Sequence, residues 1–157
     1  MKLCRVPQPV GRYLPAMLAS LFVTAMAWAQ DGNTNERLNP NTVELAALAG
    51  LPHMSETLSK AIVAQRPFAS MAAVDALIAK SLNPTQRGEL YQRLFLPIDL
   101  NTASRAEIDL IPGMTKRMAH EFEEYRPYKS LDEFRREIGK YVDATELARL
   151  ESYVTLK

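Results

Sequence analysis

Apolar residues recur at helical spacing along most of the chain after residue 37, and short polar or proline-containing segments interrupt them. Between residues 115 and 125 the apolar positions are Met118, Ala119, Phe122 and Tyr125, which predicts one amphipathic helix. Arg126-Pro127 ends it, because a residue that precedes proline disfavours the helical conformation. No segment alternates with period two between hairpin turns, so the pattern predicts an all-α fold.

Capping residues mark where the other helices begin. Ser104-x-x-Glu107 and Ser130-x-x-Glu133 are capping boxes, in which a serine side chain and a glutamate side chain bond to the first free backbone amides. Asn83-Pro84 combines a cap with a proline in the first helical turn. In the first half, Leu45, Leu48 and Leu51 are the apolar residues of the first helix. Further helices are predicted to start at Ser70, Thr115 and Asp143.

The chain contains an ungapped repeat with an offset of 60 residues. Residues 38–97 align with 98–157, and 13 of the 60 positions are identical, including Arg66-Pro67 with Arg126-Pro127. Because the identities fall on helix boundaries and core positions, they predict two copies of one unit of about four short helices. The aromatic residue after each Arg-Pro pair, Phe68 or Tyr128, is interpreted as a core residue rather than a platform for stacking bases.

Residues 1–29 are typical of a secretory signal peptide. Three basic residues precede an apolar run over 14–28, and Ala27-Trp28-Ala29 provides small residues for cleavage after Ala29. The alternative is a retained anchor, since residues 13–29 are 17 uncharged residues, near the lower limit for crossing a bilayer. Cleavage predicts a periplasmic or secreted protein without a stable membrane span. Residues 30–37 are polar without an apolar period, which predicts a flexible leader.

Cleavage changes the charge balance. The whole chain has a net charge of +1, and residues 1–29 carry three basic residues and no acidic ones, so the mature protein is at −2. This excludes binding of polyanions by bulk positive charge alone, and any anion site must be local. The only cysteine, Cys4, lies in the signal segment, and there are two histidines. We therefore expect no metal site and no cofactor.

The segment 110–119 carries the clearest candidate chemistry. Pro112-Gly113 makes a tight turn, and glycine permits the positive φ that lets neighbouring amides converge. A helix then begins with Lys116 and Arg117, whose charges lie beside free N–H groups at the positive end of a helix dipole. The combination suits a phosphate. The candidate contacts are Gly113, Met114, Thr115, Lys116 and Arg117, with Ser55 and Lys60 in the first copy.

The hydroxyl groups and the histidines of this region have simpler interpretations. Thr115 and Ser55 are expected to cap the helices that follow them, the commonest role of such residues, rather than to reach a phosphate. His53 is expected to be exposed on its turn. Since His53 and His120 occupy different repeat positions, no repeated site uses them, and an enzyme is not expected.

Both repeats resemble the ComEA-like helix-hairpin-helix family of exported DNA-binding proteins from natural transformation. The resemblance is carried by the opening over residues 98–104, the Ile-Pro-Gly-Met turn at 111–114, the link at 125–130, and Asn39-Pro40-Asn41-Thr42 with Leu51-Pro52. It implies two tandem helix-hairpin-helix units, at 38–97 and 98–157, and sequence-independent binding of duplex DNA. DNA uptake, with envelope transport or pilus proteins as partners, is the pathway that it suggests.

Two features keep an alternative open. Hairpins of this family usually carry Gly, an apolar residue and Gly, whereas the second copy has Gly113-Met114-Thr115 and the first has the degenerate His53-Met54-Ser55. The copies carry net charges of +1 and −2, and the second includes a run of acidic residues at Glu121, Glu123 and Glu124. The alternative is an envelope structural or protein-interaction module of the same fold that no longer binds DNA.

Overall fold

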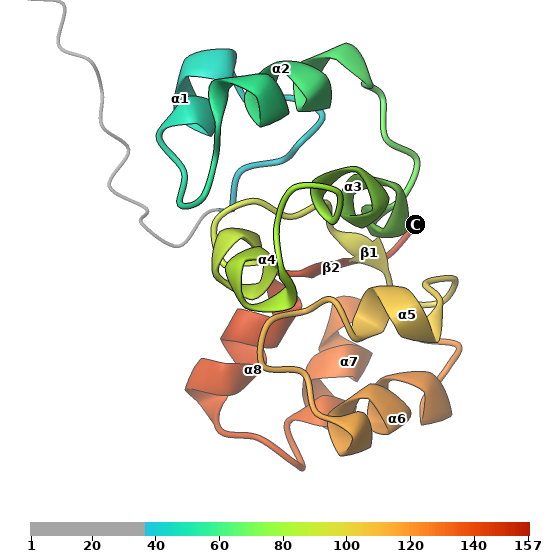
Figure 1. Cartoon of the computed structure of the whole chain (residues 1–157). Coiled ribbons are helices and arrows are strands. Elements are labelled where there is room, and N and C mark those ends of the chain that lie inside the picture. The colour runs from blue at the N-terminus through green and yellow to red at the C-terminus, as the bar shows by residue number, and fades with distance from the viewer. Residues whose placement is uncertain (1–36) are drawn as a thin grey trace, which may run out of the picture. The chain divides into compact units, whose positions relative to one another are not determined.

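A computed structural model describes residues 37–157, and these residues are mostly helical (Figure 1). The predicted signal peptide (1–29) and the leader up to residue 36 lie outside the described residues. The first repeat contains α1 (Leu45–Ala49), α2 (Glu56–Ala64), α3 (Met71–Ile78) and α4 (Pro84–Tyr91). The second contains β1 (Ile98–Asp99), α5 (Arg105–Ile108), α6 (Lys116–Glu124), α7 (Leu131–Ile138), α8 (Ala144–Glu151) and β2 (Val154–Thr155).

The predicted helix starts agree with the observed caps. Side-chain oxygens of Ser70, Asn83, Ser104, Thr115, Ser130 and Asp143 each accept a hydrogen bond from a backbone N–H three residues later. One detail was wrong: Ser130 and Glu133 do not form a reciprocal capping box. The Glu133 carboxylate accepts instead from the backbone N–H of Lys129, at 2.7 Å. The caps satisfy amides that have no partner inside the helix.

Each repeat is closed by a short parallel pairing of its first and last residues. In the second repeat β1 pairs with β2, with Ile98 opposite Val154. In the first, Leu38 forms an isolated parallel bridge with Leu94, in positions 60 residues earlier. The all-α prediction missed this pairing, because two residues are too few to show a period of two and the partner lies 56 positions away.

The contacts of a half-buried arginine also recur 60 residues apart. Arg66 donates from Nε to the carbonyl oxygen of Pro40 and from Nη2 to that of Val43, both at 2.6 Å. Arg126 does the same toward Leu100 and Ala103, at 2.6 and 2.9 Å. The Arg-Pro peptide bond that follows is cis in both repeats. The guanidinium therefore ties the end of the second helix of each repeat to the chain that precedes the first helix.

The buried side chains form one continuous core through both repeats. Phe68 and Tyr128 are buried in it, as expected for core residues. Phe95 of the first repeat packs edge-to-face on Tyr153 of the second, with ring centroids 4.9 Å apart. Helices α3 and α5 are also in contact. The two repeats thus share apolar surface that neither 60-residue unit buries alone.

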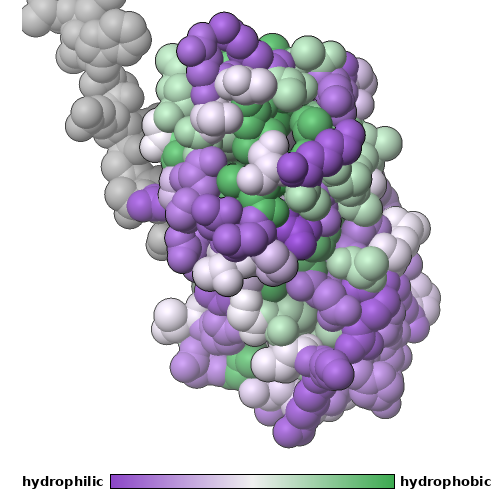
Figure 2. Space-filling view, viewed as in Figure 1, coloured by the Kyte–Doolittle hydropathy of each residue, from purple (hydrophilic) through white to green (hydrophobic). Residues whose placement is uncertain are grey.

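The surface differs between the repeats. The prediction that Leu45 lies on the apolar face of the first helix was wrong, because α1 is only five residues long and buries Leu48 alone. Leu45 is 40% exposed and Val63 of α2 is 36% exposed. In the face shown in Figure 2, apolar side chains are visible around α2, whereas hydrophilic ones predominate around α6. No helix within residues 37–157 has the length and apolar character needed to span a membrane.

The last residue of the predicted leader is fixed to the folded part. The guanidinium of Arg37 lies over the ring of Tyr153, 3.4 Å from its centroid, and also bonds to Ser152 Oγ. Arg37, the last residue of the predicted flexible leader (30–37), therefore contacts the folded part, and the rest of that leader lies outside the described residues. A cation on an aromatic face gains attraction from the ring quadrupole in addition to the contact area.

Candidate functional site

The turn between α5 and α6 has a defined backbone conformation. Gly113 adopts φ 77°, in the region that side chains disfavour, as the sequence predicted. The N–H of Met114 donates to the carbonyl oxygen of Ile111 at 3.0 Å, which closes the turn. Thr115 Oγ1 accepts from the N–H of Met118 at 3.1 Å and so caps α6. The N–H of Met114 is therefore already used within the turn, and the contact predicted for Met114 stays a prediction.

Four neighbouring backbone N–H groups remain available as hydrogen-bond donors. Within residues 37–157, no acceptor bonds to the backbone N–H of Gly113, Thr115, Lys116 or Arg117. All four residues are exposed. Amides in the first turn of a helix have no intrahelical acceptor, and they lie at the positive end of the helix dipole. The turn therefore has several backbone donors, within five consecutive residues, that no acceptor among residues 37–157 uses.

Lys116 and Arg117 add charge next to these amides. Lys116 is exposed and forms no ion pair within the described part of the chain. The side chain of Arg117 is 78% exposed, and its Nε lies 3.9 Å from Glu121 Oε1, at the outer limit for an ion pair. Its guanidinium lies 5.5 Å from the centroid of the Tyr141 ring. Both cations can therefore reach a ligand without breaking a close salt bridge.

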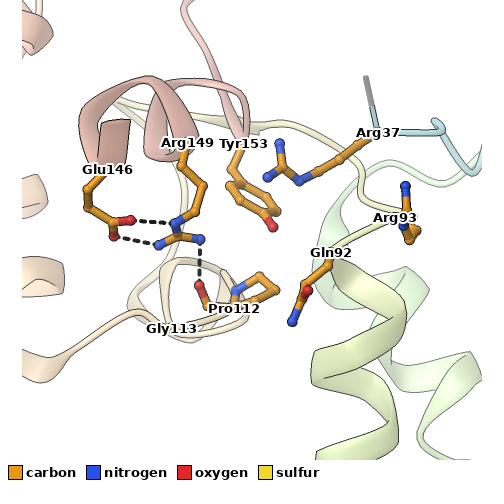
Figure 3. Close-up of a pocket in the computed structure, with 8 residues that line it drawn as sticks. All are labelled: Arg37, Gln92, Arg93, Pro112, Gly113, Glu146, Arg149 and Tyr153. Atoms are coloured by element: carbon orange, nitrogen blue, oxygen red, sulfur yellow. Dashed lines mark hydrogen bonds and ion pairs between the residues drawn. The ribbon is translucent and has the colours of Figure 1, made fainter. Parts of the chain in front are cut away.

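Two other arginines hold the turn in place. Arg149 of α8 donates from Nη1 to the carbonyl oxygen of Pro112 at 2.7 Å, and both oxygens of Glu146 accept from the same guanidinium at 2.6 Å (Figure 3). Arg105 donates from Nη2 to the carbonyl oxygen of Lys116 at 2.9 Å. The hydrogen bonds from Arg149 hold the pKa of Glu146 below its usual value. Sequence reasoning missed both arginines, because their acceptors are backbone carbonyls, 37 and 11 positions away.

The acidic residues of α6 do not form a continuous anionic face. Glu121 is largely buried, and Glu123 Oε2 accepts from Arg105 Nη1 at 3.0 Å. Glu124 lies 3.4 Å from His120. Two of the three carboxylates thus have a cationic or histidine partner other than the hairpin residues, and the third is withdrawn from the surface.

The cations outside the turn are mostly paired. Arg135 bonds to Asp132 and Glu151, Arg136 to Glu133 and Glu137, and Lys140 to Glu137. Such exposed pairs contribute little to stability, about 0–1 kcal/mol each, but they neutralise one another locally. Besides Lys116, the second repeat has two exposed cations without an ion pair among residues 37–157, Lys129 and Lys157. The α5–α6 turn is therefore a place where two adjacent cations, Lys116 and Arg117, lack a close ion pair among residues 37–157.

The corresponding turn of the first repeat has the same backbone but different charges. His53 occupies the position of Gly113 and also has a positive φ, 60°. Its Nε2 lies 2.6 Å from Glu89 Oε2, so the prediction of a merely exposed histidine was incomplete. Ser55 caps α2. Glu56 stands where the second repeat has Lys116, and it pairs with Lys60 at 2.6 Å. Ser55 and Lys60 are thus committed to their own helix.

A pocket of about 820 Å³ lies beside the α5–α6 turn. The first repeat and the residue before it contribute Arg37, Gln92 and Arg93 (Figure 3). The second repeat contributes Pro112, Gly113, Glu146, Arg149 and Tyr153. Three arginines face one glutamate in this lining. A second, smaller pocket of about 240 Å³ includes Gly113 and Glu146 in its lining, as the first pocket does.

No protein-family model, curated protein or solved structure matches the chain. No group of three or more His, Cys, Asp or Glu side chains within residues 37–157 is arranged to hold a metal ion. The chemistry of the site is therefore argued from its own geometry, which is a set of amide and cationic donors suited to an anion.

Proposed function

We propose that the protein binds the phosphates of duplex DNA through the α5–α6 turn, without sequence preference. The observation that carries this proposal is the placement of Lys116 and Arg117, which are exposed and not closely paired, among four amides of the turn and of the start of α6 that have no acceptor within residues 37–157. A helix N-terminus favours anions through its free N–H groups and its dipole, and flexible cations add to that attraction. These donors recognise phosphate oxygens, which are the same in every sequence.

The proposal includes the architecture and the cellular location suggested by the sequence. The two turns with positive φ, at His53 and Gly113, support interpreting the chain as tandem helix-hairpin-helix units with one active hairpin and one degenerate hairpin. The apolar run and the small residues before residue 30 support export to the periplasm or beyond. A role in DNA uptake follows from the resemblance to the ComEA-like family. Fusing residues 1–29 to a reporter that is active only outside the cytoplasm tests the export.

A charge-reversal experiment tests the binding site. We expect the protein to bind unrelated duplexes at low salt, with an affinity that falls by about 0.9 log unit per log unit of salt for each neutralised phosphate. Reversing both hairpin cations, with Lys116→Glu and Arg117→Glu, should abolish binding. Circular dichroism checks that the variant remains folded.

The matched control reverses two cations outside the turn. Lys80 and Lys129 are exposed and form no ion pair among the described residues, so Lys80→Glu with Lys129→Glu changes the net charge equally. This variant should retain most of the affinity. Equal loss in both variants would indicate a bulk charge effect, and no binding of the unchanged protein would refute the proposal.

The second candidate function is a protein-interaction module, and the first repeat favours it. Leu45 and Val63 are exposed on α1 and α2, while Glu56 and Lys60 neutralise each other at the hairpin of that repeat. Exposed apolar side chains around a locally neutral hairpin suit a protein surface better than a phosphate chain. A protein that binds no duplex at low salt, yet retains a defined envelope partner after Lys116→Glu, would support this function over DNA binding.

A further inference from the structure

Arg117 of the proposed DNA-binding turn lies beside an aromatic residue from another turn of the same repeat. Its guanidinium lies over the ring of Tyr141, 5.5 Å from the ring centroid, and Tyr141 belongs to the turn between α7 and α8. A cation within about 6 Å of the centroid of an aromatic ring is attracted by the ring quadrupole. Both residues line the pocket of about 240 Å³ that includes Gly113. The side chain of Arg117 thus has a support outside its own helix.

The carboxylates near Arg117 leave its donors unused. Glu121 is largely buried, and its Oε1 lies 3.9 Å from Arg117 Nε, so it attracts the guanidinium without a close hydrogen bond. Glu146 lines the same pocket, but both of its oxygens accept from Arg149. No acceptor within residues 37–157 bonds to either Nη group of Arg117. A guanidinium over a ring uses its face for that contact, so its in-plane N–H groups remain available for a ligand.

Tyr141 is itself held at its backbone and at its hydroxyl group. Its backbone N–H donates to the carbonyl oxygen of Ile138 at 3.0 Å. Its hydroxyl shares a hydrogen bond of 2.8 Å with the hydroxyl of Tyr125, at the end of α6. That hydrogen bond, together with the nearby Glu121 carboxylate, raises the pKa of the Tyr141 hydroxyl above its usual value. The ring is therefore an uncharged and well-anchored platform for the guanidinium.

The first repeat has no counterpart of this cluster. The positions 60 residues before Arg117, Glu121, Tyr125 and Tyr141 carry neither a charge nor an aromatic ring. They hold Thr57, Ala61, Gln65 and Ser81. His53 nevertheless has a positive φ at its turn, as Gly113 does, so this turn conformation does not require the cluster. The cation and its aromatic support occur together in one repeat and are absent together from the other, which favours a role in binding over a role in folding.

We propose that Tyr141 is a positioning residue that holds Arg117 ready for a phosphate of the bound DNA. This inference rests on the proposed DNA-binding function, and it gives the turn between α7 and α8 a part in that function. A long side chain loses rotamer freedom when it binds, and one that is already held loses less. Since Tyr141 acts through the guanidinium, its effect on the affinity for DNA depends on the presence of Arg117.

A double-mutant cycle on duplex binding at low salt tests this dependence. Tyr141→Leu removes the ring, and we expect the affinity to fall about two- to fivefold, the range of exposed cation–π interactions. In a protein that already carries Arg117→Ala, Tyr141→Leu should have no further effect. In the matched background Lys116→Ala, which removes the neighbouring cation instead, it should cause the full loss. Tyr141→Phe keeps the ring and should restore the affinity. Circular dichroism checks that each variant is folded.

A second measurement requires no DNA. In the free protein the ring current of Tyr141 shifts the side-chain proton resonances of Arg117, because the guanidinium lies over the ring. We expect Tyr141→Leu to remove this shift and Tyr141→Phe to keep it. If the unchanged protein binds no duplex at low salt, the proposed function fails, whereas these resonances still decide whether Tyr141 holds the guanidinium.

Three results would overturn the inference. The same loss of affinity from Tyr141→Leu with and without Arg117 would show that the ring acts through packing alone. An equal loss from Tyr141→Phe and Tyr141→Leu would assign the effect to the hydroxyl group that bonds to Tyr125. Arg117 resonances that do not change after Tyr141→Leu would show that the ring does not place the guanidinium.

Discussion

The two repeats have the same backbone scaffold but different surfaces at their first hairpins. Positive φ occurs at both His53 and Gly113, although only the second is glycine. The next helix begins with Glu56 in one repeat and with Lys116 in the other. Turn geometry is therefore a property of the scaffold and does not by itself indicate a phosphate site. The difference in charge at the start of the second helix separates the two hairpins.

The cores of the repeats differ as well. The second repeat packs Phe134 edge-to-face on Phe122 and Tyr128, with centroids 5.1 and 5.7 Å apart. The matching positions of the first repeat hold Val74, Ile62 and Phe68, all buried. An aromatic cluster buries more area per side chain than an aliphatic one. The repeat with the proposed DNA-binding turn thus has the bulkier core at these positions.

Core truncation should give the largest contrast between the repeats. Phe134→Ala removes a fully buried ring and two aromatic contacts, so we expect a loss of about 3–5 kcal/mol in the free energy of unfolding. Val74→Ala at the matching position should cost about 2 kcal/mol, since fewer methyl groups are lost. Urea unfolding followed by circular dichroism measures both values. Equal losses would show that the aromatic cluster adds nothing to the stability of the second repeat.

Placing a side chain at Gly113 and a glycine at His53 should change the free energy of unfolding by an intermediate amount. Gly113→Ala forces a Cβ into positive φ, at an expected cost of about 1–2 kcal/mol. Steric conflict is not the cause, because that Cβ would lie 3.6 Å from Arg149 Nη2, an ordinary contact. His53→Gly should change stability by less than about 1 kcal/mol, since relief of the backbone offsets the lost contact with Glu89.

Thermal unfolding of both turn variants checks this prediction. A larger loss for His53→Gly than for Gly113→Ala would show that the contact with Glu89, and not the backbone, sets the stability of the first turn. The Gly113→Ala variant also serves the DNA-binding assay, because it changes the turn without altering its charge.

The smallest effect on stability is expected from a substitution at Asp99, whose position in the first repeat is occupied by Asn39. Burial alone would raise the pKa of Asp99, but hydrogen bonds from the Thr102 hydroxyl and from the backbone N–H groups of Lys157, Thr102 and Asn101 hold it below its usual value. A lowered folded-state pKa gives a contribution to stability that is present above the unfolded pKa, about 3.9, and is lost as pH falls through the folded value.

Asp99→Asn should therefore weaken the dependence of stability on pH below about pH 4. The variant gives the second repeat the amide that the first repeat already has. Urea unfolding at pH 7 and pH 3 measures the change for both proteins. An unchanged difference between the two pH values would show that other carboxylates govern acid unfolding.

Local sequence signals predicted much of the fold and part of the site. The caps at Ser70, Asn83, Ser104 and Thr115 act within four residues, so sequence alone locates them. The positive φ of Gly113 is also a local property. The contacts of Arg149 with Pro112 and of His53 with Glu89 span 37 and 36 positions, and no local pattern indicates them.

The sequence by itself determined where most helices begin, which turn carries two cations beside a glycine, and that two similar units follow one another. Capping residues, proline and glycine influence the backbone over only a few residues, so these features can be predicted from the sequence. The tertiary structure decided which charges remain available. Three features depend on residues that only folding brings together. They are the pairs of arginines and carboxylates, the parallel closure of each repeat, and the pocket of about 820 Å³ that residues of both repeats line.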